Sequence, residues 1–116
     1  MRKRNKGRKF GREKDQRIAL FRSLARSLFI HQRIKTTEAK GKELRPIVEK
    51  MITRAKTVSL PNTRILAKDL SPRVAKKLIN EIAPTFKTRP GGYTRIIRLG
   101  QRKSDAAPMV FIELVK

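Results

Sequence analysis

The chain has 116 residues, of which 31 are Lys or Arg and nine are Asp or Glu, so its formal net charge is +22. It has no Cys, which excludes a disulfide framework and a thiolate metal site, and its apolar runs are too short for a membrane-spanning helix. Because so much positive charge repels itself in a compact domain until a polyanion binds, composition predicts a single domain whose partner is a nucleic acid.

The N-terminal segment is a basic block without any acid. Residues 1–12 carry one aromatic side chain, Phe10, and cannot offset their ordering entropy with their own contacts. We therefore interpret residues 1–14 as an extended basic arm that a phosphate-rich partner orders, and residues 15–116 as a globular body. The alternatives are a solvated tail and a mitochondrial presequence, and the second fits poorly because the segment has no amphipathic repeat. The arm residues predicted to bind RNA are Arg2, Lys3, Arg4, Lys6, Arg8, Lys9 and Arg12.

The next segment predicts a helix over about residues 16–30, with Asp15 as its N-cap. Arg22 and Arg26 lie one turn apart on its polar face and are candidate RNA contacts. A short strand is expected over residues 33–36, where Ile and Thr alternate with basic residues. The core-facing stripe of the helix is predicted to consist of Ile18, Phe21, Leu24, Ala25, Leu28 and Phe29.

Three further helices are expected in the middle of the chain. The first runs over about residues 38–56 after the cap Thr37, and Pro46 should kink or divide it. A short helix near residues 62–69 is followed by one that begins at Ser71-Pro72 and ends at Pro84. The stripe of the 38–56 helix is predicted to comprise Leu44, Ile47, Val48, Met51, Ile52 and Ala55, and that of the last helix Val74, Leu78, Ile79 and Ile82.

The C-terminal third predicts a hairpin after a loop over residues 89–92. Strands are expected over residues 93–99 and 109–115, and the stretch 86–103 contains no acid. Glycines in the loop let another backbone approach closely, Tyr93 is suited to stack on a base or to bind a phosphate, and guanidinium groups bind phosphate in a fork. The alternative is an exposed hairpin that is basic without a binding role. The predicted RNA-binding residues here are Arg89, Gly91, Gly92, Tyr93, Arg95, Arg98, Arg102 and Lys103.

Enzymatic and cofactor sites find no support in the sequence. It has neither a Walker phosphate loop nor a dinucleotide-binding fingerprint, and no pair of acids is spaced for acid–base chemistry. His31, the single histidine, lacks partner ligands and is expected to face solvent or the negative end of a helix dipole. We therefore expect no catalytic residue, no metal and no cofactor.

The order of motifs along the chain resembles one family, the bacterial large-subunit ribosomal protein L17 family. The closest resemblance is Arg-Pro-Gly-Gly-Tyr-Thr-Arg-Ile over residues 89–96, followed by Leu-Gly at 99–100 and Asp-Ala-Ala-Pro-Met at 105–109. Upstream, the similar stretches lie at 7–12, 24–25, 27–29, 33–34, 36–37, 42–46 and 81–84. Residues 56–71 match least, and Asp15 stands where many members are expected to have Ser.

The resemblance implies an α+β fold of order helix, strand, three helices, two strands, with a small mixed sheet packed on helices on one face. It also implies a structural constituent of the large ribosomal subunit, active in subunit assembly and translation in the cytoplasm, and bound to ribosomal RNA and neighbouring ribosomal proteins. In that family one neighbour is ribosomal protein L32, near the rim of the peptide exit tunnel. RNA recognition is then expected through shape and backbone contacts.

A nucleoid-type DNA-binding protein is the main rival hypothesis, since the charge alone permits it. It requires a recognition helix or a β-ribbon aimed at a groove. The clearest helical stripes are instead apolar and suited to a core, so only the basic hairpin favours this alternative.

Overall fold

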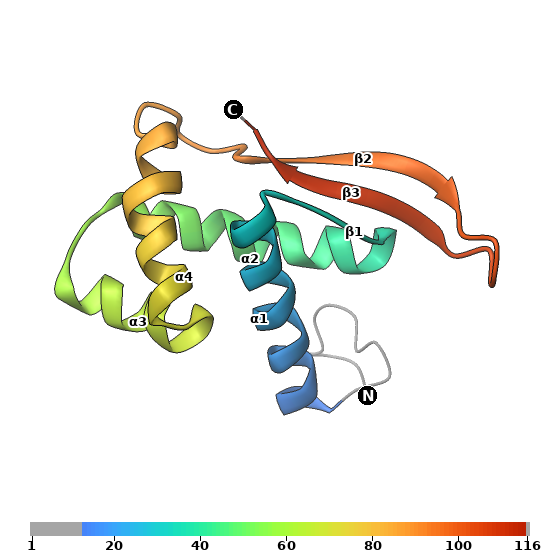
Figure 1. The fold of residues 1–116 in the computed structure, drawn as a ribbon, viewed down its shortest axis with the longest axis horizontal. Helices are drawn as coiled ribbons and strands as arrows, with labels where there is room; N and C mark the ends of the chain where they lie inside the picture. Colours follow the sequence, from blue (N-terminus) through green and yellow to red (C-terminus); the bar gives the residue numbers. More distant parts are fainter. Residues whose placement is uncertain (1–12, 116) are drawn as a thin grey trace, which may run out of the picture.

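The computed structural model describes residues 13–115 and has the predicted α+β order of elements (Figure 1). The elements are α1 (Lys14–His31), β1 (Arg33–Thr37), α2 (Glu38–Lys56), α3 (Leu60–Leu70), α4 (Pro72–Lys77), a π-helical turn η1 (Leu78–Ile82), a 3-10 turn η2 (Ala83–Phe86), β2 (Thr94–Gln101) and β3 (Pro108–Leu114). The division into an arm and a body at residue 15 stays a prediction.

The sheet has the order β1-β3-β2, and both of its strand pairs are antiparallel. The prediction of a mixed sheet is therefore wrong. The physical reason is that a short turn joins β2 to β3, which makes this pair antiparallel, and β1 then pairs with the other edge of β3 in the opposite direction. β1 and β2 consequently point the same way but do not pair with each other.

The first helix begins at Lys14, two residues before the predicted start at residue 16. Glu13, and not Asp15, is the N-cap, and its side chain makes no capping hydrogen bond. The helix ends at His31. Its C-cap, Gln32, has a left-handed φ of 64°, and the Gln32 N–H donates to the Leu28 carbonyl. Ile18 was expected in the core but is 39% exposed, because the first turns of α1 extend beyond the other elements (Figure 1).

The second helix has the predicted bounds, and the Thr37 hydroxyl accepts a hydrogen bond from the Lys40 N–H at 3.4 Å. Pro46 does not divide it: the proline lies on the exposed face, where water can hydrate the carbonyl that lost its donor. Gly41 is buried against β3, and a Cβ atom there would lie 3.0 Å from Cγ2 of Val110. The missing side chain of Gly41 therefore lets α2 approach the sheet closely.

The segment after α2 is more helical than expected. The short helix α3 begins at Leu60, and Ser59 caps it by accepting from the Asn62 N–H. Ser71 caps α4 in the predicted way. Pro84 does not end the helical segment, because the chain first widens into η1 and then tightens into η2, where a proline in the first turn needs no N–H donor.

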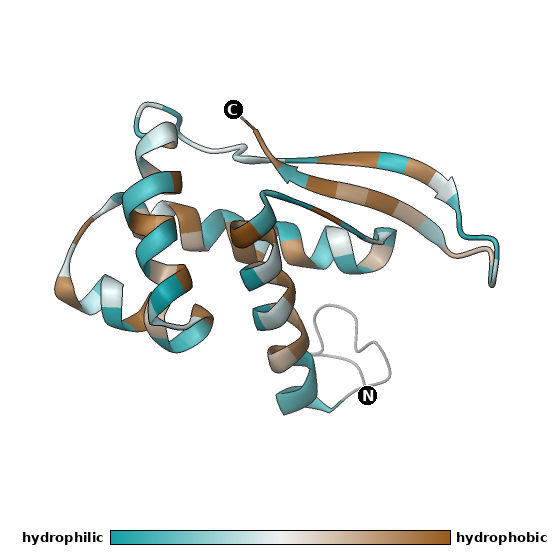
Figure 2. Cartoon of the chain, in the orientation of Figure 1, coloured by the Kyte–Doolittle hydropathy of each residue, from teal (hydrophilic) through white to brown (hydrophobic). Residues whose placement is uncertain are grey.

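One apolar core joins the helices to one face of the sheet. Hydrophobic and hydrophilic residues alternate along both the helices and the strands (Figure 2). α2 crosses beneath all three strands and contributes Leu44, Val48 and Ile52, each 0% exposed. The alternate residues Ile112 and Leu114 of β3 complete the core from the sheet. The other sheet face carries no helix among the described residues, and the far end of the hairpin extends past the helices (Figure 1). The predicted stripes of α2 and of the last helix are thereby confirmed as core.

Candidate nucleic-acid interface

The predicted RNA-binding residues fall into three regions of the molecule. The arm residues Arg2 to Arg12 lie outside the described residues 13–115. Arg22 and Arg26 lie on α1, and the remaining residues lie on the loop before β2 and on the β2–β3 hairpin. Arg22 pairs with Asp69 of α3 at 3.1 Å, whereas Arg26 forms no ion pair among the described residues.

The loop that joins η2 to β2 folds back on itself. The Arg89 Nε donates to the carbonyls of Gly91 and Gly92, both at 3.2 Å, so its guanidinium is held along its own loop. A Cβ atom on either glycine would meet nothing within 4 Å, and Gly92 has a φ of +64°. The loop thus exposes bare backbone, as the sequence predicted.

Two charged side chains of α2, Glu49 and Lys56, hold this loop in place. Neither was predicted as a functional residue from the sequence. The Glu49 carboxylate accepts from the N–H groups of Tyr93 at 3.2 Å and Thr94 at 2.9 Å, and from the Thr94 hydroxyl at 2.8 Å. The Lys56 Nζ donates to the Arg89 carbonyl at 2.6 Å and to the Tyr93 hydroxyl at 3.0 Å. These hydrogen bonds join residues 33 to 45 positions apart in sequence. The sequence therefore offered no signal for the roles of Glu49 and Lys56 beyond their position on the polar face of α2.

Tyr93 has a different role from the one expected. Its side chain is 1% exposed and packs against Phe86 with ring centroids 5.1 Å apart. The hydrogen bond from Lys56 lowers the pKa of its hydroxyl below the ordinary value of 10.0. The ring cannot stack on a base without leaving the core, so the structure corrects this prediction and makes Tyr93 an anchor of the loop.

Acids from other parts of the chain partly neutralise the acid-free stretch 86–103. Arg95 pairs with Glu113 of β3 at 2.7 Å, and Arg98 approaches Glu38 of α2 at 3.5 Å. The hydrogen bond from Arg95 lowers the pKa of Glu113. Lys103 forms no ion pair within residues 13–115. The stretch is therefore less positive in space than its sequence suggests.

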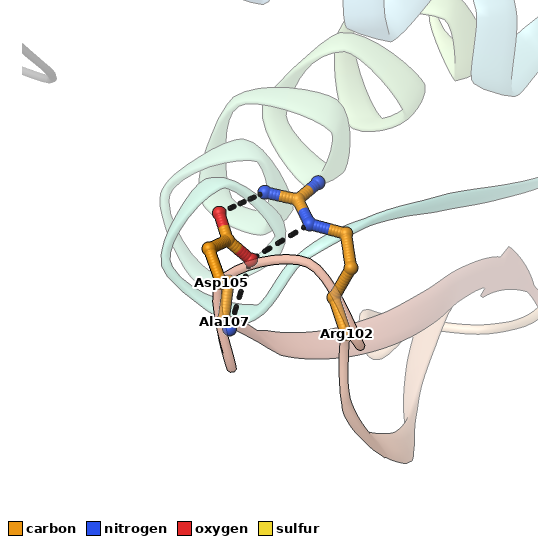
Figure 3. A network of polar contacts seen from close by, with 3 residues as sticks. All are labelled: Arg102, Asp105 and Ala107. Carbon is orange, nitrogen blue, oxygen red and sulfur yellow. Dashed lines mark hydrogen bonds and ion pairs between the residues drawn. The ribbon is translucent and has the colours of Figure 1, made fainter.

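The end of the hairpin is closed by an arginine–aspartate fork (Figure 3). The Arg102 guanidinium donates to both carboxylate oxygens of Asp105, at 3.0 and 2.8 Å, and the Ala107 N–H donates to the same carboxylate at 3.2 Å. These bonds hold the pKa of Asp105 at about 2, below the model-compound value of 3.8. Arg102 is thus engaged in shaping the turn, and a phosphate would have to compete with Asp105 for it.

The open face of the sheet combines basic and apolar side chains. Glu113, on the central strand, lies opposite Arg33 of β1 and Arg95 of β2 and pairs with both. The Arg33 guanidinium lies 3.7 Å from the centre of the Phe111 ring. This face therefore has ordered cations that are exposed to a partner.

The described residues contain no group of three or more His, Cys, Asp or Glu side chains that could hold a metal ion. No helix among residues 13–115 is long and apolar enough to cross a membrane.

The comparison with known proteins identifies the family. The family model of ribosomal protein L17 matches residues 20–115. The chain belongs to the ribosomal protein L17 family. It is 50% identical to the large ribosomal subunit protein bL17 of Pelobacter propionicus over 100% of this chain and 92% of that protein. It is 52% identical to the bL17 of Gemmatimonas aurantiaca over 99% of this chain and 98% of that protein.

Membership of the L17 family confirms the resemblance noted in the sequence. It also identifies the chain as a ribosomal protein, a component of the ribosome in the cytoplasm, and it confirms the prediction that the chain is not an enzyme. The family-model match begins at residue 20, so it does not extend over the basic arm.

Proposed function

We propose that this L17 protein is a structural constituent of the large ribosomal subunit and binds its ribosomal RNA through the basic arm and the Gly91-Gly92 loop. The observation that carries the proposal is the full-length similarity to two large-subunit proteins in a chain with a net charge of +22. Such a charge is offset by an RNA backbone, which releases counterions when phosphates are neutralised.

The body, the Gly91-Gly92 loop and the arm have different roles in the proposed RNA binding. The helices and the sheet form one body around a single core, so its cations hold fixed positions relative to one another. The Gly91-Gly92 loop presents backbone without side chains to an approaching ribose–phosphate strand. Arg26 and Lys103, which form no ion pair among residues 13–115, are available for phosphates. Arg22, Arg95 and Arg102 must release their carboxylate partners before they can bind a phosphate. We expect the arm to enter crevices between RNA helices, where phosphates crowd.

The partners in this proposal are large-subunit ribosomal RNA and neighbouring ribosomal proteins. By family resemblance, one of those neighbours is L32, close to the rim of the peptide exit tunnel. Few base-edge contacts are expected, because the deep groove of A-form RNA is closed to side chains. The contribution to assembly is to hold folded RNA segments together.

The test is co-sedimentation of the full chain with large ribosomal subunits stripped of their own copy of this protein, against recovery with chromosomal DNA. We expect the protein to travel with the subunits at moderate salt and to be released as salt rises, since phosphate contacts weaken with ionic strength. Equal or greater recovery with DNA would support the nucleoid hypothesis and contradict the proposal.

A further inference from the structure

A hollow lies between the C-terminal half of α2 and the Gly91-Gly92 loop. Its walls include Lys50, Thr53, Arg54 and Asn62 on one side and Pro90 and Gly91 on the other. We propose that this hollow, the α2–loop hollow, binds the phosphate backbone of one RNA strand, with Lys50 and Arg54 as the phosphate contacts. The inference rests on the proposed function and adds two phosphate contacts, Lys50 and Arg54, that lie outside the basic segments of the sequence.

The two cations of the hollow carry charge that the described acids do not neutralise. Lys50 and Arg54 are both exposed, and neither forms an ion pair with any residue in the range 13–115. Four residues separate them, which is about 6 Å along a helix and places both on one side of α2. Two adjacent cations that pair with no acid among residues 13–115 are suited to hold a single strand of phosphates.

The neighbouring hollow on the same helix provides a contrast. It is lined by Lys42 and Arg98 together with Glu38, and Glu38 pairs with both cations, at 3.2 and 3.5 Å. A phosphate entering there must displace an existing pair. The α2–loop hollow has no such competitor.

Oxygen acceptors near Lys50 and Arg54 would repel a phosphate if they had no hydrogen-bond donors. The Asn62 Nδ2 donates to the carbonyls of Arg54 at 3.3 Å and Thr57 at 2.8 Å, at the negative end of α2. The Glu49 carboxylate, the single acid of the hollow, receives three hydrogen bonds from Tyr93 and Thr94. The Arg54 and Thr57 carbonyls and the Glu49 carboxylate thus already accept hydrogen bonds from protein donors.

The loop that forms one wall of the hollow is already ordered in the free protein. Lys56 and Glu49 hold both ends of the Arg89–Thr94 loop, so Gly91 does not have to be ordered when RNA binds. A Cβ atom on Gly91 would have nothing within 4 Å, which leaves room for a ribose–phosphate chain. Glu49 and Lys56 act here as positioning residues.

The experiment titrates deproteinised large-subunit ribosomal RNA with the full chain at several salt concentrations. The test variant is Lys50→Gln with Arg54→Gln. The matched control is Arg73→Gln with Lys76→Gln, which removes the same charge from exposed positions on α4. If Lys50 and Arg54 each contact a phosphate, the slope of log affinity against log salt should fall by about one to two units in the test variant, and clearly less in the control.

A second variant separates shape from charge. Gly91→Val adds a side chain where the free protein has open space, so we expect the fold to be retained while the approach of a ribose–phosphate chain to this wall is obstructed. We expect it to weaken RNA binding at least severalfold without changing thermal stability.

Equal losses in the test and control pairs, or full affinity in Gly91→Val, would overturn the α2–loop hollow and leave the proposed function intact. A wild-type chain without salt-dependent affinity for ribosomal RNA would overturn both.

Discussion

At the scale of single residues, Glu49 shows how one acid in a very basic chain is used. Its carboxylate is placed where three donors of the loop and of β2 converge, and Thr94 is only 3% exposed. Hydrogen bonds to a charged acceptor are stronger than neutral ones, so this side chain stabilises the junction between α2 and the hairpin.

We expect Glu49→Gln to lower the free energy of unfolding by about 1–3 kcal/mol, because an amide replaces one acceptor oxygen with a donor that faces the buried Thr94 N–H. Urea unfolding gives this difference, and faster hydrogen exchange of the Tyr93 and Thr94 amides locates it. Glu81→Gln is the control, since Glu81 is exposed and its carboxylate has no hydrogen bond or ion pair within the described part of the chain. The same loss in both variants would show that removal of an acid, and not the loop contact, is responsible.

At the scale of elements, the β2–β3 hairpin combines a predictable strand pattern with an unpredictable charge pattern. The alternation of residues located both strands, and the register then brought Glu113 opposite Arg95. The turn is set by the Arg102–Asp105 fork and by the left-handed Ala106, which has a φ of 57°. The hairpin is thus closed by its own acid and base.

This fork predicts a pH dependence of the turn. Because the folded pKa of Asp105 is depressed to about 2, the fork stabilises the turn above the unfolded value of 3.8 and loses this effect as pH falls from there toward 2. NMR titration of the Asp105 carboxyl should give an apparent pKa near 2 in the wild type. In Arg102→Gln we expect it to move back toward 3.8, with little effect on global stability because the pair is exposed. An unchanged titration in Arg102→Gln would contradict the role of the fork.

At the scale of the whole molecule, the residues that form the core and the basic arm belong to different parts of the chain. The apolar stripes of α1, α2 and the last helix form one core, while the arm that precedes α1 has almost no apolar side chain to add to it. Stability of the body and affinity for RNA are therefore expected to depend on different residues.

Deleting residues 2–12 tests this separation. We expect the melting temperature of the free protein to change little, or to rise slightly as self-repulsion falls, and the affinity for ribosomal RNA to fall strongly. Circular dichroism melts and RNA titrations at fixed salt measure the two effects. Full RNA affinity in the truncated chain would refute the role of the arm.

The sequence by itself determined most of the fold. Helical periodicity and the Thr37 and Ser71 caps located the helices, and the family motifs correctly gave their order, because such signals depend on neighbouring residues. The same local signals predicted a helix end at Pro84 and a buried Ile18, and both predictions were wrong. Burial and helix termination at these positions depend on the elements packed around them.

Only the tertiary structure decided which charges are free. The sequence marked the stretch 86–103 as a positive surface, but Glu38 and Glu113 reach it from other elements, and Tyr93 turns inward to meet Lys56. Conversely, Lys50 and Arg54 were unremarkable on the polar face of a helix until the fold placed Gly91 beside them. Electrostatic interactions act through space between residues distant in the chain, so a count of charges along the sequence indicates a polyanion partner but not the surface that meets it.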